Sequence, residues 1–295
     1  MKNTPQQLHI PVLLDEVVNV LAPKNGETYL DLTAGLGGHS KEITRQIGDE
    51  KLAILVDRDE DAIRELRKQC GFTNLMKSDF LSACKELSDK GKQFDMILMD
   101  LGVSSPQLDR AQRGFSFMSD GPLDMRMDQS QSWTAAELVN RASEKDLSQI
   151  IVQYGEESVK TASRIAAAIR RNRPIKTTTQ LAIVIESVLP RTGKIHPATR
   201  TFQAIRIAIN DELEQLRQSL EILPELLKPG GRIAIITFHS LEDRIVKQFL
   251  YERSQSGYES DFKLVTKKPI TASKNEIVNN PRARSAKLRA AVKTK

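Results

Sequence analysis

Short apolar runs alternate with helical patterns over the first hundred residues, and this alternation constrains the fold more than any other feature. The runs at 29–32, 52–56, 72–76 and 94–99 each predict a buried strand, and the spacing of Ala62 and Leu66 is typical of a helix between two of them. Uninterrupted apolar strands joined by helices are typical of a parallel sheet with helices on both faces. The sequence therefore predicts an open α/β sheet.

The strand pattern stops after residue 100 and returns only at 230–238, with further strands expected at 262–266 and 287–292. A loop rich in Gly, Ser, Pro and Asp follows residue 100, and after it the patterns are helical. Helix starts are expected at Thr134, which opens a capping box, and at Ser143. Further helices are expected at 158–171, at 179–188 and in one long helix from about 198 toward 227.

These boundaries predict a sheet domain built from two parts of the chain, residues 1–108 and 213–295, with a mostly helical domain inserted at 109–212. No apolar run approaches the ~18 residues of a membrane span, and the N-terminus lacks a charged leader followed by an apolar run. The two cysteines and four histidines show no spacing typical of a metal site. We expect a cytoplasmic protein with no membrane partner and no bound metal.

A basic stretch runs from Lys160 to Arg206 and contains ten Lys and Arg residues, with Glu186 as its only acid. A solvated helical face would account for it, but a stretch this long and this poor in acids also fits a surface that binds a polyanion. We favour the second interpretation. The candidate substrate-binding residues in this stretch are Arg170, Arg171, Arg173 and Arg200.

A glycine-rich segment, DLTAGLGGH at 31–39, joins the first strand to the first helix. Glycines such as Gly35 and Gly37 allow positive φ angles and a close approach of the backbone to a ligand. Asp57 ends the second strand, where a carboxylate can bind both hydroxyls of an adenosine ribose. The order of strand, loop, helix, strand and acid predicts a nucleoside cofactor.

Asp31 favours S-adenosylmethionine over a dinucleotide. A dinucleotide would place its pyrophosphate near this carboxylate, whereas the ammonium and sulfonium of S-adenosylmethionine are attracted to it. The glycine spacing also departs from the G-x-G-x-x-G pattern of NAD sites. Phe80 follows the third strand, and it either stacks on the adenine or is a core aromatic that opens a helix.

Asp100 follows the fourth strand, at the edge where open α/β sheets carry out their chemistry. Its carboxylate could accept a hydrogen from a base amine, whose lone pair is otherwise delocalised into the ring. Such a hydrogen bond would make the nitrogen more nucleophilic, and the charge would stabilise the positive nitrogen that methyl transfer creates. A turn or helix-capping acid is the alternative role.

Nine segments distributed over the chain carry motifs. They are HIPVLLDE at 9–16, GLGGHS at 35–40, DRD at 57–59, DLGVSSPQ at 100–107, GFSFM at 114–118, GPLDMRMD at 121–128, HPATRTFQ at 196–203, FHSLEDR at 238–244 and NPRARS at 280–285. Together they make the chain resemble the RsmH (MraW) family of bacterial 16S ribosomal RNA methyltransferases.

The resemblance implies a Rossmann-like class I S-adenosylmethionine-dependent methyltransferase sheet with an inserted helical domain. It also implies methylation of the N4 amine of a cytidine in the decoding region of the small ribosomal subunit. The cofactor-binding positions that it implies are Gly37, Gly38, His39, Asp57, Phe80, Asp100 and Gln107. Asp31 and Gly35 are further cofactor-binding candidates, because both lie in the glycine-rich segment at 31–39.

The segment 100–107, called the chemistry loop below, departs from a common pattern. Many amine methyltransferases have Asp or Asn followed by Pro-Pro and an aromatic that stacks on the base, but here the residues are Asp100-Leu-Gly-Val. The stacking aromatic could come from Phe115, Phe117 or Phe238, and the sequence leaves the choice open.

Four further features allow more than one role. Arg126, between Asp124 and Asp128, either lines a base pocket as a substrate-binding residue or ties the loop down by ion pairs. His239 is a candidate catalytic residue that contacts the substrate, with a structural role as the alternative. Trp133 is expected in the core of the inserted domain, with a stacking platform as the alternative role. The basic tail from residue 282 either touches RNA or, at 287–292, forms an edge strand.

Three other functions fit parts of the pattern: a dehydrogenase on the same fold, a ribosome-assembly factor that clamps RNA without catalysis, and a DNA amine methyltransferase. The main prediction is an RNA amine methyltransferase that acts on 16S ribosomal RNA or the small ribosomal subunit. The sequence leaves the oligomeric state open, with a homodimer among the alternatives.

Overall fold

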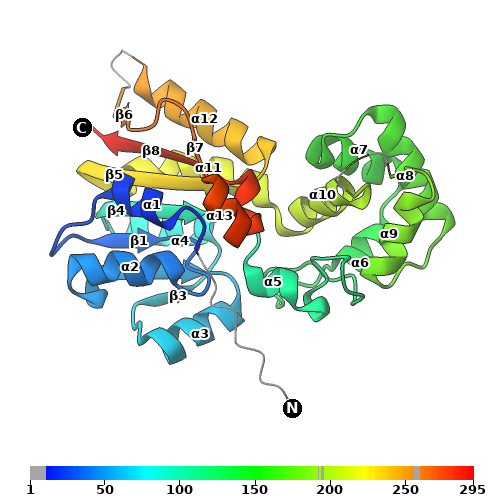
Figure 1. The fold of residues 1–295 in the computed structure, drawn as a ribbon, viewed down its shortest axis with the longest axis horizontal. Helices are drawn as coiled ribbons and strands as arrows, with labels where there is room; N and C mark the ends of the chain where they lie inside the picture. The colour runs from blue at the N-terminus through cyan, green and yellow to red at the C-terminus, as the bar shows by residue number, and fades with distance from the viewer. Residues whose placement is uncertain (1–10, 192, 194–195, 256–259) are drawn as a thin grey trace. The chain divides into compact units, whose positions relative to one another are not determined.

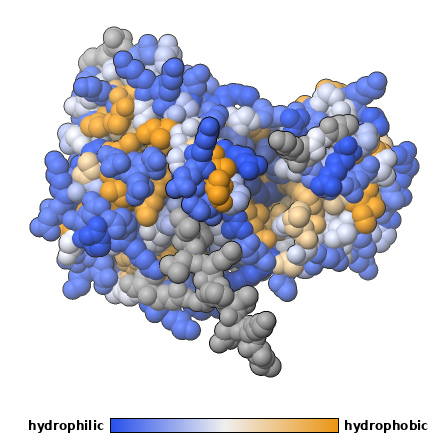
Figure 2. All heavy atoms as spheres, viewed as in Figure 1, coloured by the Kyte–Doolittle hydropathy of each residue, from blue (hydrophilic) through white to orange (hydrophobic). Residues whose placement is uncertain are grey.

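The computed structural model describes residues 11–191, 193, 196–255 and 260–295, which divide into two compact units. The sheet unit extends to Gly102 and resumes at Glu214, and the helical unit spans Val103–Leu213. Figure 1 shows that the strands belong to the first unit and that helices α5–α10 lie in the second. No helix in the described ranges is long and apolar enough to cross a membrane. Hydrophilic residues cover most of the visible face of both units (Figure 2).

Within the described residues the sheet has eight strands, ordered β3-β2-β1-β4-β5-β8-β6, with β7 paired to β8. Neighbours from β3 to β5 run parallel, and β8 runs antiparallel to β5, β6 and β7. This arrangement confirms the predicted α/β sheet. The strands are β1 (Tyr29–Asp31), β2 (Ala53–Asp57), β3 (Leu75–Lys77), β4 (Phe94–Asp100), β5 (Leu227–Thr237), β6 (Phe262–Leu264), β7 (Ile270–Thr271) and β8 (Lys287–Lys293).

Two hydrophobic clusters cover the two faces of the sheet. One includes residues of α1 (Leu14–Leu21), α2 (Gly38–Ile47) and α3 (Glu60–Cys70). The other includes residues of α4 (Phe80–Asp89), α11 (Glu212–Leu226) and α12 (Ser240–Ser254). The short helix α13 (Lys274–Asn279) and the 3-10 helices Glu50–Leu52 and Pro281–Ser285 complete this part of the chain. Burial of both faces explains why the central strands are continuously apolar.

The expected edge strand at 287–292 is an interior strand, which corrects the prediction. β8 pairs with β5 on one side and with β6 and β7 on the other. Two basic side chains of the tail serve the fold: Lys287 and Arg289 bind Asp243 at 2.9 and 2.7 Å. Burial raises the pKa of Asp243, but the hydrogen bonds from these two cations outweigh it and lower the pKa overall.

The helical unit contains α5 (Ser105–Asp109), the 3-10 helix Ala111–Arg113, α6 (Ala135–Arg141), α7 (Glu144–Gly155), α8 (Val159–Arg171), α9 (Thr178–Glu186) and α10 (Ala198–Asn210). The expected helix starts are confirmed: Thr134 caps α6 through a capping box, and Ser143 caps α7. Trp133 corrects an expectation, because it is 51% exposed, with the Arg141 guanidinium 5.9 Å from its ring centroid.

The single long helix expected from 198 toward 227 is instead two helices, which is a second correction. Asp211 ends α10 with a left-handed backbone, at φ 50°, and α11 begins at Glu212. Aspartate adopts this conformation more readily than most residues because its short side chain can form local hydrogen bonds. Arg206 and Glu212 bridge the break with two hydrogen bonds of 2.8 Å. The apolar spacing on both sides of the break is helical, so periodicity alone did not reveal it.

Candidate active site

The acids at the carboxyl ends of β1, β2 and β4 define the candidate site in the sheet unit. Asp31, Asp57 and Asp100 are the last residues of these three strands. Because the strands are parallel neighbours, the three acids lie at the same edge of the sheet. The glycine-rich loop follows β1 and leads into α2, which begins at Gly38.

Asp57 holds this loop through its carboxylate. The backbone N–H of Gly35 donates to Oδ2 and that of Asp59 donates to Oδ1, each at 2.8 Å. Each oxygen keeps a second lone pair, which suits an acceptor for two ribose hydroxyls. Burial raises the pKa of Asp57 to about 6 despite these donors, and the carboxylates of Asp59 and Asp31 act in the same direction as burial.

Asp31 is buried and receives three hydrogen bonds from its own surroundings. Tyr29 Oη and Ser40 Oγ donate to Oδ2 at 2.9 and 2.5 Å, and the N–H of Thr33 donates to Oδ1 at 3.1 Å. Burial raises the pKa of Asp31 in spite of these donors. None of these three donors carries a positive charge. Asp31 therefore contributes a negative electrostatic potential to the site.

Asp100 differs from the other two acids because one of its oxygens is unsatisfied. Oδ1 is buried and has no hydrogen-bond partner within the described part of the chain. Oδ2 lies 3.7 Å from Nδ1 of His39, whose Nε2 is 2.9 Å from the carbonyl oxygen of Val12. Burial, then the charges of Asp31 and Glu242, raise the pKa of Asp100 well above its ordinary value.

These residues fit S-adenosylmethionine. A buried carboxylate oxygen without a donor is costly, and a ligand that brings a donor or a positive charge would relieve that cost. Asp31 adds a second acid, and its negative charge is the cause, after burial, of the raised pKa of Asp100. The site thus favours the ammonium and sulfonium of this cofactor and disfavours a pyrophosphate.

The loop backbone has the form expected of a ligand-binding turn. Gly37 caps α2 with φ 76°, a conformation that favours glycine. Gly38 follows it as the first residue of α2, and the imidazole of His39 is 7% exposed. These positions agree with the sequence-based assignments of Gly35, Gly37, Gly38 and His39, whose contacts with the cofactor stay predictions.

Phe80 lies three residues after Lys77, the β3 residue that pairs with Asp57, and it is the first residue of α4. Its side chain is partly buried against the cluster on the α4 face. Both roles proposed from the sequence therefore remain compatible with its place. Gln107 belongs to the helical unit, where its Oε1 accepts the N–H of Ser104 at 3.0 Å and closes a capping box on α5.

A family model described as the MraW methylase family matches residues 6–294. The chain belongs to this family. Relatives named Ribosomal RNA small subunit methyltransferase H include one from Acidobacterium capsulatum, 46% identical over 98% of this chain and 99% of its own. Another, from Cyanothece sp., is 50% identical over 97% of this chain and 95% of its own. A solved rRNA methylase from Streptococcus thermophilus is 11% identical with a TM-score of 0.43, and the match covers 100% of this chain and 99% of that one.

Family membership confirms three predictions made from the sequence: the resemblance itself, the methyltransferase activity and the use of S-adenosylmethionine. It removes the dehydrogenase alternative. The residue assignments are separate from this conclusion and depend on the geometry of the site.

His239 has a structural role that the sequence had left as the alternative. It is the N-cap of α12, and its Nδ1 accepts the N–H of Glu242 at 3.3 Å. In return, Oε2 of Glu242 accepts the N–H groups of Phe238 and His239 at 2.8 and 3.2 Å. A catalytic role for His239 stays a prediction. Glu242 was missed, although the His-x-x-Glu spacing resembles a capping box.

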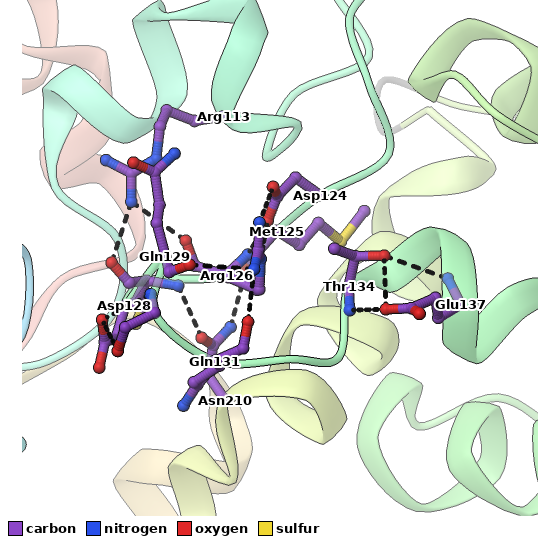
Figure 3. A network of polar contacts seen from close by, with 12 residues as sticks. Arg113, Asp124, Met125, Arg126, Asp128, Gln129, Gln131, Thr134, Glu137 and Asn210 are labelled. Carbon is purple, nitrogen blue, oxygen red and sulfur yellow. Dashed lines mark hydrogen bonds and ion pairs between the residues drawn. The ribbon is translucent and has the colours of Figure 1, made fainter.

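Arg126 ties down the loop of the helical unit (Figure 3). Its Nε and Nη2 each donate to Asp124 at 2.8 Å, and Nη1 donates to the carbonyl oxygens of Gln129 and Gln131. Burial raises the pKa of Asp124, but the hydrogen bonds from Arg126 outweigh it. The geometry thus supports the loop-tying alternative, and the guanidinium keeps little capacity for a substrate.

Arg113 and Asn210 hold the same loop from the other side. Nη2 of Arg113 donates to the carbonyl oxygens of Arg126 and Met127, both at 3.0 Å. The Asn210 amide accepts from the N–H of Met127 and donates to the carbonyl of Met125, both at 2.8 Å. The sequence did not single out either residue, because their partners are backbone groups that no short-range pattern reveals.

The basic stretch has both structural and exposed members. Arg173 is structural, since it donates to the carbonyl oxygens of Val139 and Ala142 at the end of α6, at 2.8 and 2.6 Å. Burial, followed by repulsion from Arg170, lowers the pKa of Arg173. Arg171 is exposed, and Arg170 and Arg200 are exposed with weak ion pairs to Glu144 and Glu157, at 3.2 and 3.4 Å. Lys194 lies outside the described residues.

Proposed function

We propose that this chain transfers a methyl group from S-adenosylmethionine to the N4 amine of a cytidine in 16S ribosomal RNA, in the cytoplasm. The observation that carries the proposal is the buried Oδ1 of Asp100, which is an acceptor without a partner among the described residues. Asp100 ends β4 at the same edge of the sheet as the glycine-rich loop. The curated relatives are named for the small-subunit RNA, which supports this substrate.

The chemistry follows from the state of Asp100. When bound, the cofactor would supply an electrophilic methyl group and would leave as the neutral thioether S-adenosylhomocysteine. Oδ1 of Asp100 accepts a hydrogen of the N4 amine, which turns the nitrogen lone pair toward that methyl group and stabilises the positive charge that develops on nitrogen. The raised pKa of Asp100 then favours its uptake of the proton that the methylated amine loses.

Residues of the glycine-rich loop and of the neighbouring strand ends would hold the cofactor in this proposal. Asp57 would accept hydrogen bonds from the two ribose hydroxyls, Phe80 would contact the adenine, and Asp31 would provide negative potential near the sulfonium and ammonium. Gly35 and Gly37 let the backbone approach the cofactor closely, with φ angles of 54° and 76°. His39 orders the loop through Val12 and faces Asp100.

The exposed arginine side chains of the helical unit bind the RNA backbone in this proposal. Arg170 and Arg171 lie in the last turn of α8, and Arg200 lies in the first turn of α10. Cations near phosphates release counterions, which makes the affinity strongly dependent on salt. Arg126 and Arg173 support this surface from within the unit.

The test is mass spectrometry of 16S ribosomal RNA from cells with and without the gene, together with methyl transfer from labelled cofactor to the purified RNA. Loss of a single N4-methyl mark, restored by the wild-type gene, is the expected result. Binding of RNA without transfer would indicate an assembly factor instead. Transfer to single-stranded DNA of the same sequence at an equal rate would contradict the choice of RNA.

A further inference from the structure

Phe238 lies next to the chemistry loop and directly follows β5, which ends at Thr237. The β4–β5 register pairs Asp100 with Ile236, and the N–H of Leu101 donates to the Ile236 carbonyl oxygen at 3.0 Å. Two residues farther along, Phe238 comes beside Gly102. A β-carbon at position 102 would lie 3.4 Å from Cδ2 of the Phe238 ring, so the ring lies against the backbone of the loop.

Asp100 and Phe238 lie on the same face of the sheet. Side chains alternate between faces along a strand, and paired residues of parallel strands share a face. Met96 and Leu98 of β4, with Ala234 and Ile236 of β5, belong to the hydrophobic cluster of the α2 face. The same alternation places Asp100 and Phe238 on that face, and Phe238 packs against this cluster while staying partly exposed.

The other two aromatic candidates are already in contact with neighbours inside the helical unit. Phe115 is 7% exposed, and the Arg113 guanidinium lies 5.9 Å from its ring centroid. The Phe117 ring has His196 at 4.5 Å and the edge of Phe202 at 4.8 Å between centroids. Of the three, only Phe238 belongs to the unit that contains Asp100.

The loop itself is built to leave room for this ring. Gly102 has φ +91°, which favours glycine, and it occupies part of the segment where related amine methyltransferases have Pro-Pro and an aromatic. The backbone of Phe238 is fixed as well, since its N–H donates to Oε2 of the buried Glu242 at 2.8 Å. Phe238 thus brings an aromatic ring beside the chemistry loop, which has none in its residues 100–107.

We infer that Phe238 is the aromatic on which the target cytosine stacks while its N4 amine meets Asp100, an inference that rests on the proposed function. Phe238 is then a substrate-contacting residue, and the His239–Glu242 capping box is its positioning element. Stacking is tolerant of ring type, so Phe238→Tyr and Phe238→Trp should preserve methylation, whereas Phe238→Leu should not.

Single-turnover methylation with saturating cofactor tests the inference. We expect Phe238→Leu to lower the RNA-dependent kcat/KM about 10- to 100-fold, the scale of one lost base–aromatic stack, while Phe238→Tyr and Phe238→Trp stay within about threefold. Affinity for S-adenosylhomocysteine should be unchanged. Phe249→Leu is the matched control, because it removes a ring from the opposite face of the same unit, where Phe249 packs on Phe262.

A second measurement uses the wild-type protein and so avoids any folding defect. RNA with 5-iodocytidine in place of the methylated cytidine should cross-link, on irradiation, to the tryptic peptide 233–244, which contains Phe238. A cross-link to peptide 114–126, to another peptide or to none overturns the inference, as does wild-type kcat/KM in Phe238→Leu. A wild-type enzyme that methylates no cytidine would instead contradict the proposed function.

Discussion

Asp100 in the sheet unit and Arg126 in the helical unit both belong to motif segments of the sequence, yet their hydrogen-bonding states are opposite. The Arg126 guanidinium donates to Asp124 and to two carbonyl oxygens of its own loop. Oδ1 of Asp100 is buried without a partner in the described ranges. The comparison teaches that a charged residue satisfied by its own loop serves the fold, whereas one left unsatisfied at a strand end indicates a ligand.

The largest effect is expected at Asp100. Asp100→Asn keeps the size and one acceptor oxygen but removes the charge, so single-turnover methylation should slow by roughly 10²- to 10⁴-fold at saturating cofactor. The free energy of unfolding should not fall, because Oδ1 is buried without a donor among the described residues. A near-wild-type rate would contradict the proposed role, and a rate restored by more cofactor would reduce Asp100 to a binding residue.

Substitution of Arg126 should lower the stability of the protein and leave cofactor binding unchanged. Arg126→Ala leaves the buried side of Asp124 without its partner, and we expect a loss of about 2 kcal/mol in unfolding free energy by chemical denaturation. Affinity for S-adenosylhomocysteine should be unchanged. Arg141→Ala is the control. The Arg141 side chain is 67% exposed, its ion pair with Glu137 is 3.6 Å long, and its guanidinium lies 5.9 Å from the Trp133 ring centroid, so the substitution should cost under ~1 kcal/mol. Full stability combined with loss of RNA binding would make Arg126 a substrate residue.

The pH dependence of cofactor binding should reflect Asp57. Its pKa is raised to about 6, and only the ionised carboxylate accepts both ribose hydroxyls well. Affinity for S-adenosylhomocysteine should therefore be highest above pH 6 and fall below it, by at most about tenfold per pH unit. Calorimetric titration of Asp57→Asn should show weaker binding with a shallower pH profile. An unchanged profile would assign the titration to another acid, with Asp100 the first candidate.

The smallest effect concerns the exposed arginines of α8. If about four phosphates are neutralised, log K for RNA should fall with log salt with a slope near −3, and Arg170→Ala with Arg171→Ala should make that slope shallower by about 1.5. The matched control replaces Arg64 and Arg217, which are 65% and 53% exposed in the sheet unit. An equal change of slope in both double variants would move the RNA surface away from α8.

Sequence patterns predicted the features that depend on short stretches of chain. Continuous apolar runs located the central strands, and the helix starts at Thr134 and Ser143 were found from their capping residues. Asp31, Asp57 and Asp100 could be placed at one edge because acids ending parallel strands must meet there. In each case the physical cause is local: side-chain periodicity, capping hydrogen bonds, or the direction of a strand.

Only the tertiary structure decided which partner each side chain finds. Asp211 breaks a helix that periodicity predicts as continuous, and β8 is an interior strand because β6 and β7 pair with its outer side. Arg173 is satisfied by carbonyl oxygens more than thirty residues away. Phe238 comes beside Gly102 although their numbers differ widely, because β4 and β5 are neighbours in register. Such contacts depend on packing between distant segments, which no local pattern encodes.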